Sequence, residues 1–229
     1  MKKLVVLTGA GISAESGIPT FRDAGGLWEG HRVEEVATPG AWARNPELVL
    51  QFYNERRRKL QEVEPNDGHR ALVDLESKYQ VTVVTQNVDD LHERAGSKNV
   101  IHLHGELLKA RSSRFEHLVY HWPKDIRLGD FCERGAQLRP HIVWFGEMVP
   151  MMEEAARVTS LADILLIVGT SMQVYPAAGL AGYVDFNVPI YYIDPKPSIN
   201  YELAHADTVR VIPDKASTGV RKIVEELLL

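Results

Sequence analysis

The chain has 229 residues, a formal net charge of −5 and a single cysteine, Cys132. This length can form one substantial hydrophobic core with a smaller lobe. The acidic balance excludes a broad basic field for nucleic acid, and one cysteine excludes an internal disulfide. The apolar run at the N-terminus ends at Thr8, and no stretch reaches the roughly 18 apolar residues of a membrane helix. We therefore expect a cytoplasmic protein without a specific nucleic-acid site and without a membrane segment.

Short apolar runs alternate with longer segments of helical character along the chain. Runs rich in Val and Ile without strict alternation are typical of strands covered on both faces. The predicted strands are Leu4–Leu7, Val81–Val84, Ile164–Val168 and Val188–Ile193, and the predicted helices are Ser13–Ser16, Pro46–Glu62, Asn66–Lys78, Met151–Ser160, Pro176–Tyr183 and Ala216–Leu228. This order predicts an α/β fold, a Rossmann-like parallel sheet with helices on both faces.

The segment Leu107–Arg139 interrupts this alternation, because it mixes charged and polar residues without a period and contains turn signals. We expect it to form a smaller inserted lobe together with the helical segment near residues 31–62. The predicted division assigns residues 1–30, 63–106 and 140–229 to the sheet domain, and residues 31–62 and 107–139 to the small lobe.

The first predicted strand leads directly into Gly9, Ala10 and Gly11, followed by a short helix. Glycine lets the backbone turn sharply and approach a ligand, and free N–H groups at a helix start attract a pyrophosphate. The next glycine, Gly17, comes too late for the ordinary dinucleotide fingerprint, and no second strand ends in an acidic residue about twenty positions on. Glycine spacing alone therefore fits a nucleotide loop and a ligand-free turn equally well.

The longer string Gly9–Arg22 resembles the NAD-binding signature of the sirtuin family. Four further segments agree with that family in order: Thr85–His92 is similar to its QN-x-D segment, His102–Glu106 to its catalytic-histidine segment, Val143–Glu147 to its substrate-binding strand, and Gly169–Pro176 to its second nucleotide loop. The matches span almost the whole chain apart from the irregular segment. The resemblance implies an enzyme that removes acyl groups from protein lysines and consumes NAD, giving nicotinamide and O-acyl-ADP-ribose.

The resemblance also implies catalytic roles for three residues. His104 would be the general base, because imidazole accepts a proton from a hydroxyl near neutral pH. It is selected over His102 because it directly precedes Gly105. Asn87 and Asp89 would orient the ribose and nicotinamide, although without the resemblance they also fit a polar loop with an aspartate helix cap.

Further residues are assigned to the two substrates by the same resemblance. Asp194 stands where the family often has asparagine, and Phe21 fits core packing equally well. An extended peptide can add as a strand between two edges of the site. The residues expected to bind NAD are Gly9, Ala10, Gly11, Ile12, Phe21, Arg22, Gln86, Asn87, Asp89, Gly169, Thr170, Ser171 and Asp194; those expected to flank the acyl-lysine peptide are Val143, Trp144, Phe145, Gly146 and Val174.

Tyr53 and Arg56 stand three positions apart on a predicted helix and therefore share one face. Their spacing resembles the Tyr-x-x-Arg pair of sirtuins that prefer acidic acyl chains, and Ala24 resembles the small residue that leaves room in that pocket. Arg56 could bind a terminal carboxylate through two donors. On spacing alone the pair fits an ordinary charged helix face, but with the resemblance we expect desuccinylation or demalonylation alongside deacetylation.

Most sirtuins hold a structural zinc with four cysteines, whereas here Ser112 and Ser113 lie where the first cysteine pair is expected. His117, His121 and Cys132 would supply three ligands, and a closed structural site needs four. We therefore expect a small lobe without metal. It would instead be stabilised by packing of Phe115, Leu118, Tyr120, Trp122, Ile126, Leu128 and Phe131.

Four other functions compete with this interpretation. A protein ADP-ribosyltransferase or an NAD glycohydrolase would use the same ribose chemistry with a different acceptor. A non-catalytic NAD-sensing or peptide-reading module should lack His104 or Asn87. An NAD-dependent oxidoreductase fits least, because the glycine spacing and the missing acidic strand end both disagree.

Overall fold

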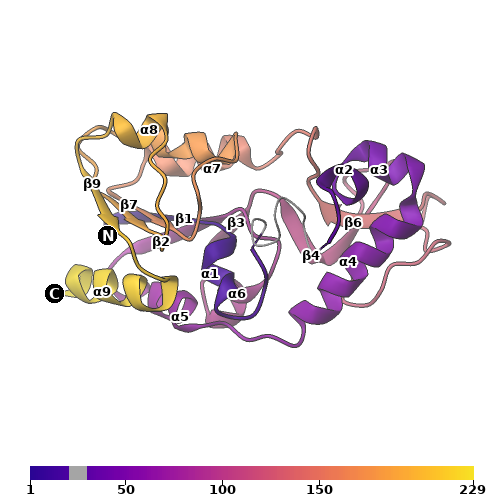
Figure 1. Ribbon diagram of the computed structural model, residues 1–229, viewed down its shortest axis with the longest axis horizontal. Helices are drawn as coiled ribbons and strands as arrows, with labels where there is room; N and C mark the ends of the chain where they lie inside the picture. Colours follow the sequence, from indigo (N-terminus) through magenta and orange to yellow (C-terminus); the bar gives the residue numbers. More distant parts are fainter. Residues whose placement is uncertain (21–29) are drawn as a thin grey trace.

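The computed structural model describes residues 1–20 and 30–229, which form two sheets with helices packed on them (Figure 1). The larger sheet contains β1 (Lys3–Thr8), β2 (Gln80–Thr85), β3 (Val100–His102), β7 (Ile164–Val168), β8 (Ile190–Ile193) and β9 (Val209–Ile212), and the smaller one contains β4 (Gly105–Ser112), β5 (Val119–His121) and β6 (Leu138–Ile142). The helices are α1 (Ala10–Ala14), α2 (Val33–Val36), α3 (Pro39–Arg44), α4 (Pro46–Leu60), α5 (Asp67–Asp74), α6 (Leu91–Ala95), α7 (Met152–Ser160), α8 (Tyr201–Ala204) and α9 (Ala216–Leu228), with the 3-10 helices η1 (Leu75–Ser77) and η2 (Ala177–Tyr183).

The six strands of the larger sheet are parallel and run in the order β3-β2-β1-β7-β8-β9. The chain leaves β1 toward β2 on one side and later returns to β7 on the other side of β1. In open parallel sheets, ligands bind at such a switch point, outside the carboxyl ends of the strands. A ligand site is therefore expected at the loops that follow β1 and β7.

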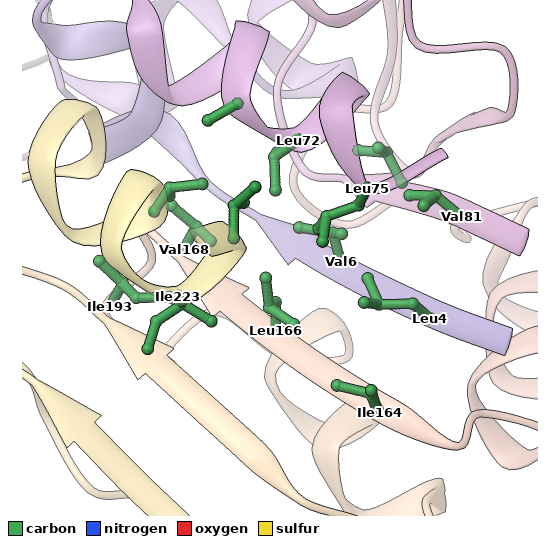
Figure 2. Packing of buried hydrophobic residues seen from close by; sticks show 14 of the residues in the cluster. Leu4, Val6, Leu72, Leu75, Val81, Ile164, Leu166, Val168, Ile193 and Ile223 are labelled. Carbon is green, nitrogen blue, oxygen red and sulfur yellow. The ribbon is translucent and has the colours of Figure 1, made fainter. Parts of the chain in front are cut away.

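Both faces of this sheet are buried, and strand alternation divides the side chains between them. Leu4 and Val6 pack with α5 and α9 on one face, as Figure 2 shows, whereas Val5 and Leu7 pack with α7 and η2 on the other. Fully burying such a side chain stabilises a fold by about 1.5–3 kcal/mol. The predicted α/β fold with helices on both faces is confirmed.

Local signals explain where the long helices begin. The Asn66 side chain accepts a hydrogen bond from the backbone N–H of Gly68 at 2.9 Å and so caps α5. Asn45 caps α4 in the same way by accepting from Leu48 N–H at 3.1 Å, and Pro46 occupies the first turn.

Several elements differ from the sequence expectation. The first short helix begins at Ala10 rather than Ser13, and the predicted helix 176–183 is the 3-10 helix η2. The short strands β3 and β9 have no long apolar run, and the sequence gives no prediction for them. Both pair on one side only, at the edges of the sheet, so they need fewer buried side chains than a central strand.

The small lobe contains an antiparallel sheet in the order β5-β4-β6, packed beside α2, α3 and α4 at one end of the molecule (Figure 1). The segment read as irregular therefore holds regular strands. Their pattern is weak because β4 carries a register shift between Gly105 and Ala110 and buries Arg111.

Most of the apolar residues predicted to hold this lobe together pack into one cluster, but two do not. Phe115, Leu118, Tyr120, Trp122 and Ile126 belong to the cluster that also contains Leu50, Ala110, Cys132, Ala136 and Leu138. The expectation for Leu128 and Phe131 is wrong, because these side chains are 48% and 59% exposed at the lobe surface.

The position of the expected zinc pair is occupied by a hydrogen-bonded turn. The Ser112 hydroxyl oxygen accepts from the backbone N–H groups of Arg114 and Phe115, and the Cys132 thiol donates to it at 3.4 Å. Among the described residues, no group of three or more His, Cys, Asp or Glu side chains could hold a metal ion. None of the helices in residues 1–20 and 30–229 combines the length and apolar character needed to cross a membrane.

Candidate active site

The two glycine loops lie directly against each other at the switch point. Gly9 N–H donates to Val168 O at 3.1 Å, and Gly11 N–H donates to Gly169 O at 2.8 Å. A Cβ atom on Gly11 would come within 2.7 Å of Gly169 Cα, and one on Gly169, whose φ is +61°, within 2.3 Å of Ile12 N. These glycines are therefore required by backbone packing between the loops, a reason that glycine spacing did not reveal.

Asn87 and Asp89 converge on one hydroxyl group, that of Ser13 in α1. Asn87 Nδ2 donates to Ser13 Oγ at 3.1 Å and to Gly9 O at 3.1 Å, while Ser13 Oγ donates to Asp89 Oδ2 at 2.9 Å. All three side chains are buried. Burial raises the pKa of Asp89 from 3.8 to about 6, although the bond from Ser13 opposes this rise. The loops after β1 and β2 are thus joined by a directional hydrogen-bond network.

Two buried histidines extend this network below the loops. His69 Nδ1 accepts the Asn66 backbone N–H, so its proton is on Nε2, which faces Ser13 Oγ at 3.5 Å. His92 Nε2 lies 3.0 Å from the Thr8 hydroxyl, and the two imidazoles meet edge to face at 4.9 Å. Burial lowers the pKa of His69 to about 4 and that of His92 well below 6.5. Both rings are therefore neutral at pH 7.

Sequence reasoning did not identify Ser13, His69 and His92 as members of the site. Ser13 and His92 lie inside the quoted strings Gly9–Arg22 and Thr85–His92, so their presence in those strings was the available signal. His69 follows the helix cap Asn66 without any recognisable motif, and only the structure brings it to Ser13.

The surroundings of His102 and His104 shift their pKa values in opposite directions. His104 Nδ1 lies 2.9 Å from Gln86 O, and a carbonyl oxygen can only accept, so Nδ1 holds the proton and Nε2 keeps its lone pair. His102 Nδ1 faces Asn87 O at 3.2 Å, and its Nε2 faces a Glu93 carboxylate oxygen at 2.7 Å. The pKa of His102 is raised by Glu93 against the opposing effect of burial, whereas burial lowers that of His104. Of these two histidines, His104 therefore has the ring that favours the neutral form, with Nε2 left as its basic nitrogen.

The second loop joins this arrangement through Thr170. Gln86 Nε2 donates to Thr170 Oγ1 at 3.0 Å, and the Tyr192 hydroxyl donates to Thr170 O at 2.8 Å. Asp194 directly follows β8, and its carboxylate accepts the Lys196 backbone N–H. Its position at the carboxyl end of a strand neighbouring β7 places it along the same edge.

The remaining residues that are expected to bind NAD differ from one another in burial. Ile12 is fully buried in the sheet core, so its backbone rather than its side chain faces the loop. Ala10, Ser171 and Val174 are half-buried at the edge. Phe21, Arg22 and Ala24 lie outside the described residues.

The segment expected to flank the peptide follows β6 as an irregular stretch and a turn rather than as a strand. Val143 N–H donates to His104 O at 2.9 Å, which connects this segment to the predicted base. Phe145 is 48% exposed and Gly146 has a φ of +90° in the turn, whereas the Trp144 side chain is buried in the lobe. Within this segment, Val143 thus contacts His104 directly, and Phe145 and Gly146 are the exposed residues that follow it.

Tyr53 and Arg56 share one face of α4, as their spacing predicts. The Tyr53 oxygen accepts a hydrogen bond from Trp144 Nε1 at 3.1 Å, and burial raises the pKa of the phenol far above 10. The Arg56 guanidinium stacks on the Phe52 ring at 3.2 Å and donates to the Phe52 carbonyl. A hollow of about 370 Å³ between α4 and residues 125–128 is lined by none of the predicted site residues.

Comparison with known proteins agrees with the family resemblance of the sequence motifs. The Sir2 family profile matches residues 9–176. A protein of Helicobacter pylori (strain J99 / ATCC 700824) named NAD-dependent protein deacylase is 61% identical over 196 residues, covering 86% of this chain and 84% of its own. A protein of the same name from Bacteroides thetaiotaomicron is 52% identical over 234 residues, covering 100% and 99%. A solved Sir2 homologue–NAD complex is 40% identical with a TM-score of 0.87, covering 99% of this chain and 90% of its own.

Proposed function

The chain belongs to the Sir2 family, and from this premise we propose that it is an NAD-dependent protein-lysine deacylase that consumes NAD. The observation that carries the proposal is the convergence of loops after β1, β2, β3 and β7 at one sheet edge. There Asn87 donates a hydrogen bond to Gly9 O, and Asp89 accepts one from Ser13. The His104 side chain bonds Gln86 O, directly before Asn87. The position of these residues outside the carboxyl ends of the strands, at the switch point of the sheet, suits a dinucleotide.

Each polar residue has a role that its geometry suits. When bound, NAD supplies a ribose carbon that can exchange nicotinamide for the carbonyl oxygen of the acyl-lysine. Asn87 is held by Gly9 and Ser13 and would orient the ribose and nicotinamide. The Asp89 carboxylate would favour positive charge developing on the sugar. His104 Nε2 would take the proton of a ribose hydroxyl, because its other nitrogen is occupied by Gln86 O.

The acyl-lysine peptide would lie beside Val143, Phe145 and Gly146. Backbone groups there can pair with an extended peptide, which supplies affinity with little sequence choice. Val143 already pairs with His104 through its N–H group, so a peptide at this edge would bring its acyl-lysine near the base.

For the acyl chain we propose that Arg56 and Tyr53 bind the terminal carboxylate of succinyl- or malonyl-lysine, alongside deacetylation. The support is their common face on α4 and the position of Tyr53 against Trp144, the residue after Val143. Arg56→Met should lower kcat/KM for succinyl-lysine about 10- to 100-fold more than for acetyl-lysine, because a charge-assisted bond is lost. Lys59→Met, on an exposed position of the same helix, is the matched control. Equal losses on both substrates would contradict the pocket.

The reaction class is tested by its stoichiometry. Purified protein is incubated with NAD and matched acetyl-, succinyl- and malonyl-lysine peptides, and the products are quantified by mass spectrometry. We expect one nicotinamide and one O-acyl-ADP-ribose for each acyl group removed. ADP-ribose attached to the peptide, or NAD hydrolysis with the acyl-lysine intact, would instead indicate an ADP-ribosyltransferase or a glycohydrolase.

A further inference from the structure

A continuous chain of contacts joins the predicted base to the predicted acyl pocket. His104 O accepts the Val143 backbone N–H at 2.9 Å, and the next residue, Trp144, donates its indole N–H to the Tyr53 oxygen at 3.1 Å. Trp144 is 2% exposed and Tyr53 is fully buried, so this bond lies away from water. A hydrogen bond in such surroundings is costly to lose, because the group left behind has no solvent to replace its partner.

The chemistry of the two side chains fixes the direction of this bond. An indole nitrogen has a hydrogen and no lone pair for accepting, so Trp144 can only donate and the Tyr53 oxygen must accept. The hydroxyl hydrogen of Tyr53 therefore points away from Trp144. The contact sets both the position of the Tyr53 oxygen and the direction in which its own hydrogen can be donated.

Trp144 is itself held from its other face by charged groups. The Arg139 guanidinium lies 3.3 Å from the indole ring centroid and pairs with Glu147 at 2.7 Å. Glu147 also accepts the Trp144 backbone N–H at 2.8 Å and pairs with Arg111 at 3.2 Å. These groups fix both the main chain and the ring of Trp144, so the indole donor has one preferred direction.

We propose that Trp144 is a specificity-determining positioning residue, whose indole N–H holds the Tyr53 hydroxyl in the orientation needed to receive the carboxylate of an acidic acyl chain. This inference rests on the proposed binding of succinyl- and malonyl-lysine by Tyr53 and Arg56. Acetyl-lysine has no terminal carboxylate, so its reaction does not depend on the orientation of that hydroxyl. Loss of the Trp144–Tyr53 hydrogen bond should therefore lower activity on succinyl-lysine more than activity on acetyl-lysine.

The test uses four variants of the full chain: Trp144→Phe, Tyr53→Phe, their combination, and Trp42→Phe as the matched control. Trp42 contacts the Trp144 ring with centroids 5.9 Å apart in the same apolar cluster, but it does not donate the bond to Tyr53. Values of kcat/KM are measured with succinyl- and acetyl-lysine peptides, and thermal unfolding monitors the fold.

We expect Trp144→Phe to lower the succinyl-to-acetyl ratio of kcat/KM about three- to tenfold, the size of one hydrogen bond. Tyr53→Phe should lower the ratio as well, and the double variant should lower it no further than Tyr53→Phe alone. Trp42→Phe should leave the ratio unchanged. If Trp144→Phe does not fold, Glu147→Gln replaces it, because it removes the charge that holds Arg139 on the ring and should lower the same ratio.

Contrary results are distinguishable from failure of the proposed function. Equal losses on both peptides, or additive losses in the double variant, would overturn the role of Trp144 while leaving the acyl pocket intact. A wild-type protein that removes acetyl but not succinyl or malonyl groups would overturn the pocket and this inference together.

Discussion

The carboxyl edge of the large sheet and the small lobe both bury polar groups, but they stabilise them differently. At the sheet edge the buried groups are mainly hydroxyls, an amide and neutral imidazoles, centred on Ser13. In the lobe they are guanidiniums, with Arg139 and Arg111 sharing Glu147. Among the described residues, the network at the sheet edge joins these neutral groups to one carboxylate, that of Asp89, whereas the lobe relies on ion pairs. We therefore expect substitutions at the sheet edge to lower mainly kcat/KM, and substitutions in the lobe to lower mainly the free energy of unfolding.

Removing the proposed base should give the largest effect. We expect His104→Ala to lower kcat/KM for acyl-peptide deacylation about 10²- to 10⁴-fold, the usual contribution of general acid–base catalysis. The His104 side chain is half-buried and bonds a backbone carbonyl, Gln86 O, so thermal unfolding should change little. Product formation is followed by mass spectrometry. His102→Ala serves as the comparison, and a larger loss there would reverse the assignment of the two histidines.

The lobe cluster provides the matching test of stability. Leu138 is 1% exposed in the cluster, so Leu138→Ala should lower the free energy of unfolding by about 2–5 kcal/mol through the cavity it creates. Phe131→Ser, at a 59% exposed position of the same lobe, should change it by no more than about 0.5 kcal/mol. Urea unfolding measures both. Similar losses in the two variants would mean that the lobe is not held together by this cluster.

Asp89 affects both stability and catalysis. Its burial as a carboxylate lowers the stability of the fold, while its charge is proposed to favour positive charge on the sugar. Its folded-state pKa of about 6 lies above the ordinary 3.8, so the folded protein binds this proton more tightly and loses stability as pH rises from about 4 to 6. Asp89→Asn should abolish that loss, worth up to about 3 kcal/mol, and should lower deacylase activity. His69, with its pKa lowered to about 4, gives the opposite slope in both proteins and cancels in the comparison.

Urea unfolding at pH 4 and pH 8 for the wild type and Asp89→Asn provides the measurement. The stability of the variant relative to the wild type should increase between the two values. Parallel pH dependence in the two proteins would contradict the raised pKa.

Metal removal should give the smallest effect. Ser112 accepts hydrogen bonds from Arg114 and Phe115 where a zinc ligand is otherwise expected, so chelation should leave the midpoint of thermal unfolding unchanged. Elemental analysis should find less than stoichiometric zinc. Stoichiometric zinc, or a lower midpoint after chelation, would show that the lobe depends on metal.

The sequence predicted the sheet domain better than the lobe, and the physical reasons are visible in particular residues. Runs such as Ile164–Val168 are apolar throughout because both of their faces are buried, and such a run predicts a central strand. β4 buries Arg111 and shifts register, and its partner β6 lies more than twenty residues away, so neither strand shows a simple period. Arg111 and Arg139 are buried in this lobe, where Glu147 pairs with both.

At the candidate site, the motifs named the residues but not how they support one another. The strings containing Gly9, Asn87 and His104 pointed to one edge of the sheet. They could not show that Gly11 and Gly169 are required by each other's backbone, nor that Ser13 joins Asn87 to Asp89. Such contacts join residues that are more than seventy positions apart, and only the fold brings them together.

A crystal structure of the protein with NAD and an acetyl-lysine peptide would test the central claim most directly. We expect the dinucleotide to lie across the ends of β1 and β7, with a ribose hydroxyl within about 3 Å of His104 Nε2 and the nicotinamide side near Asn87. NAD bound away from the Gly9–Gly11 turn, or an orientation that places the adenine rather than the nicotinamide ribose at His104, would contradict this account.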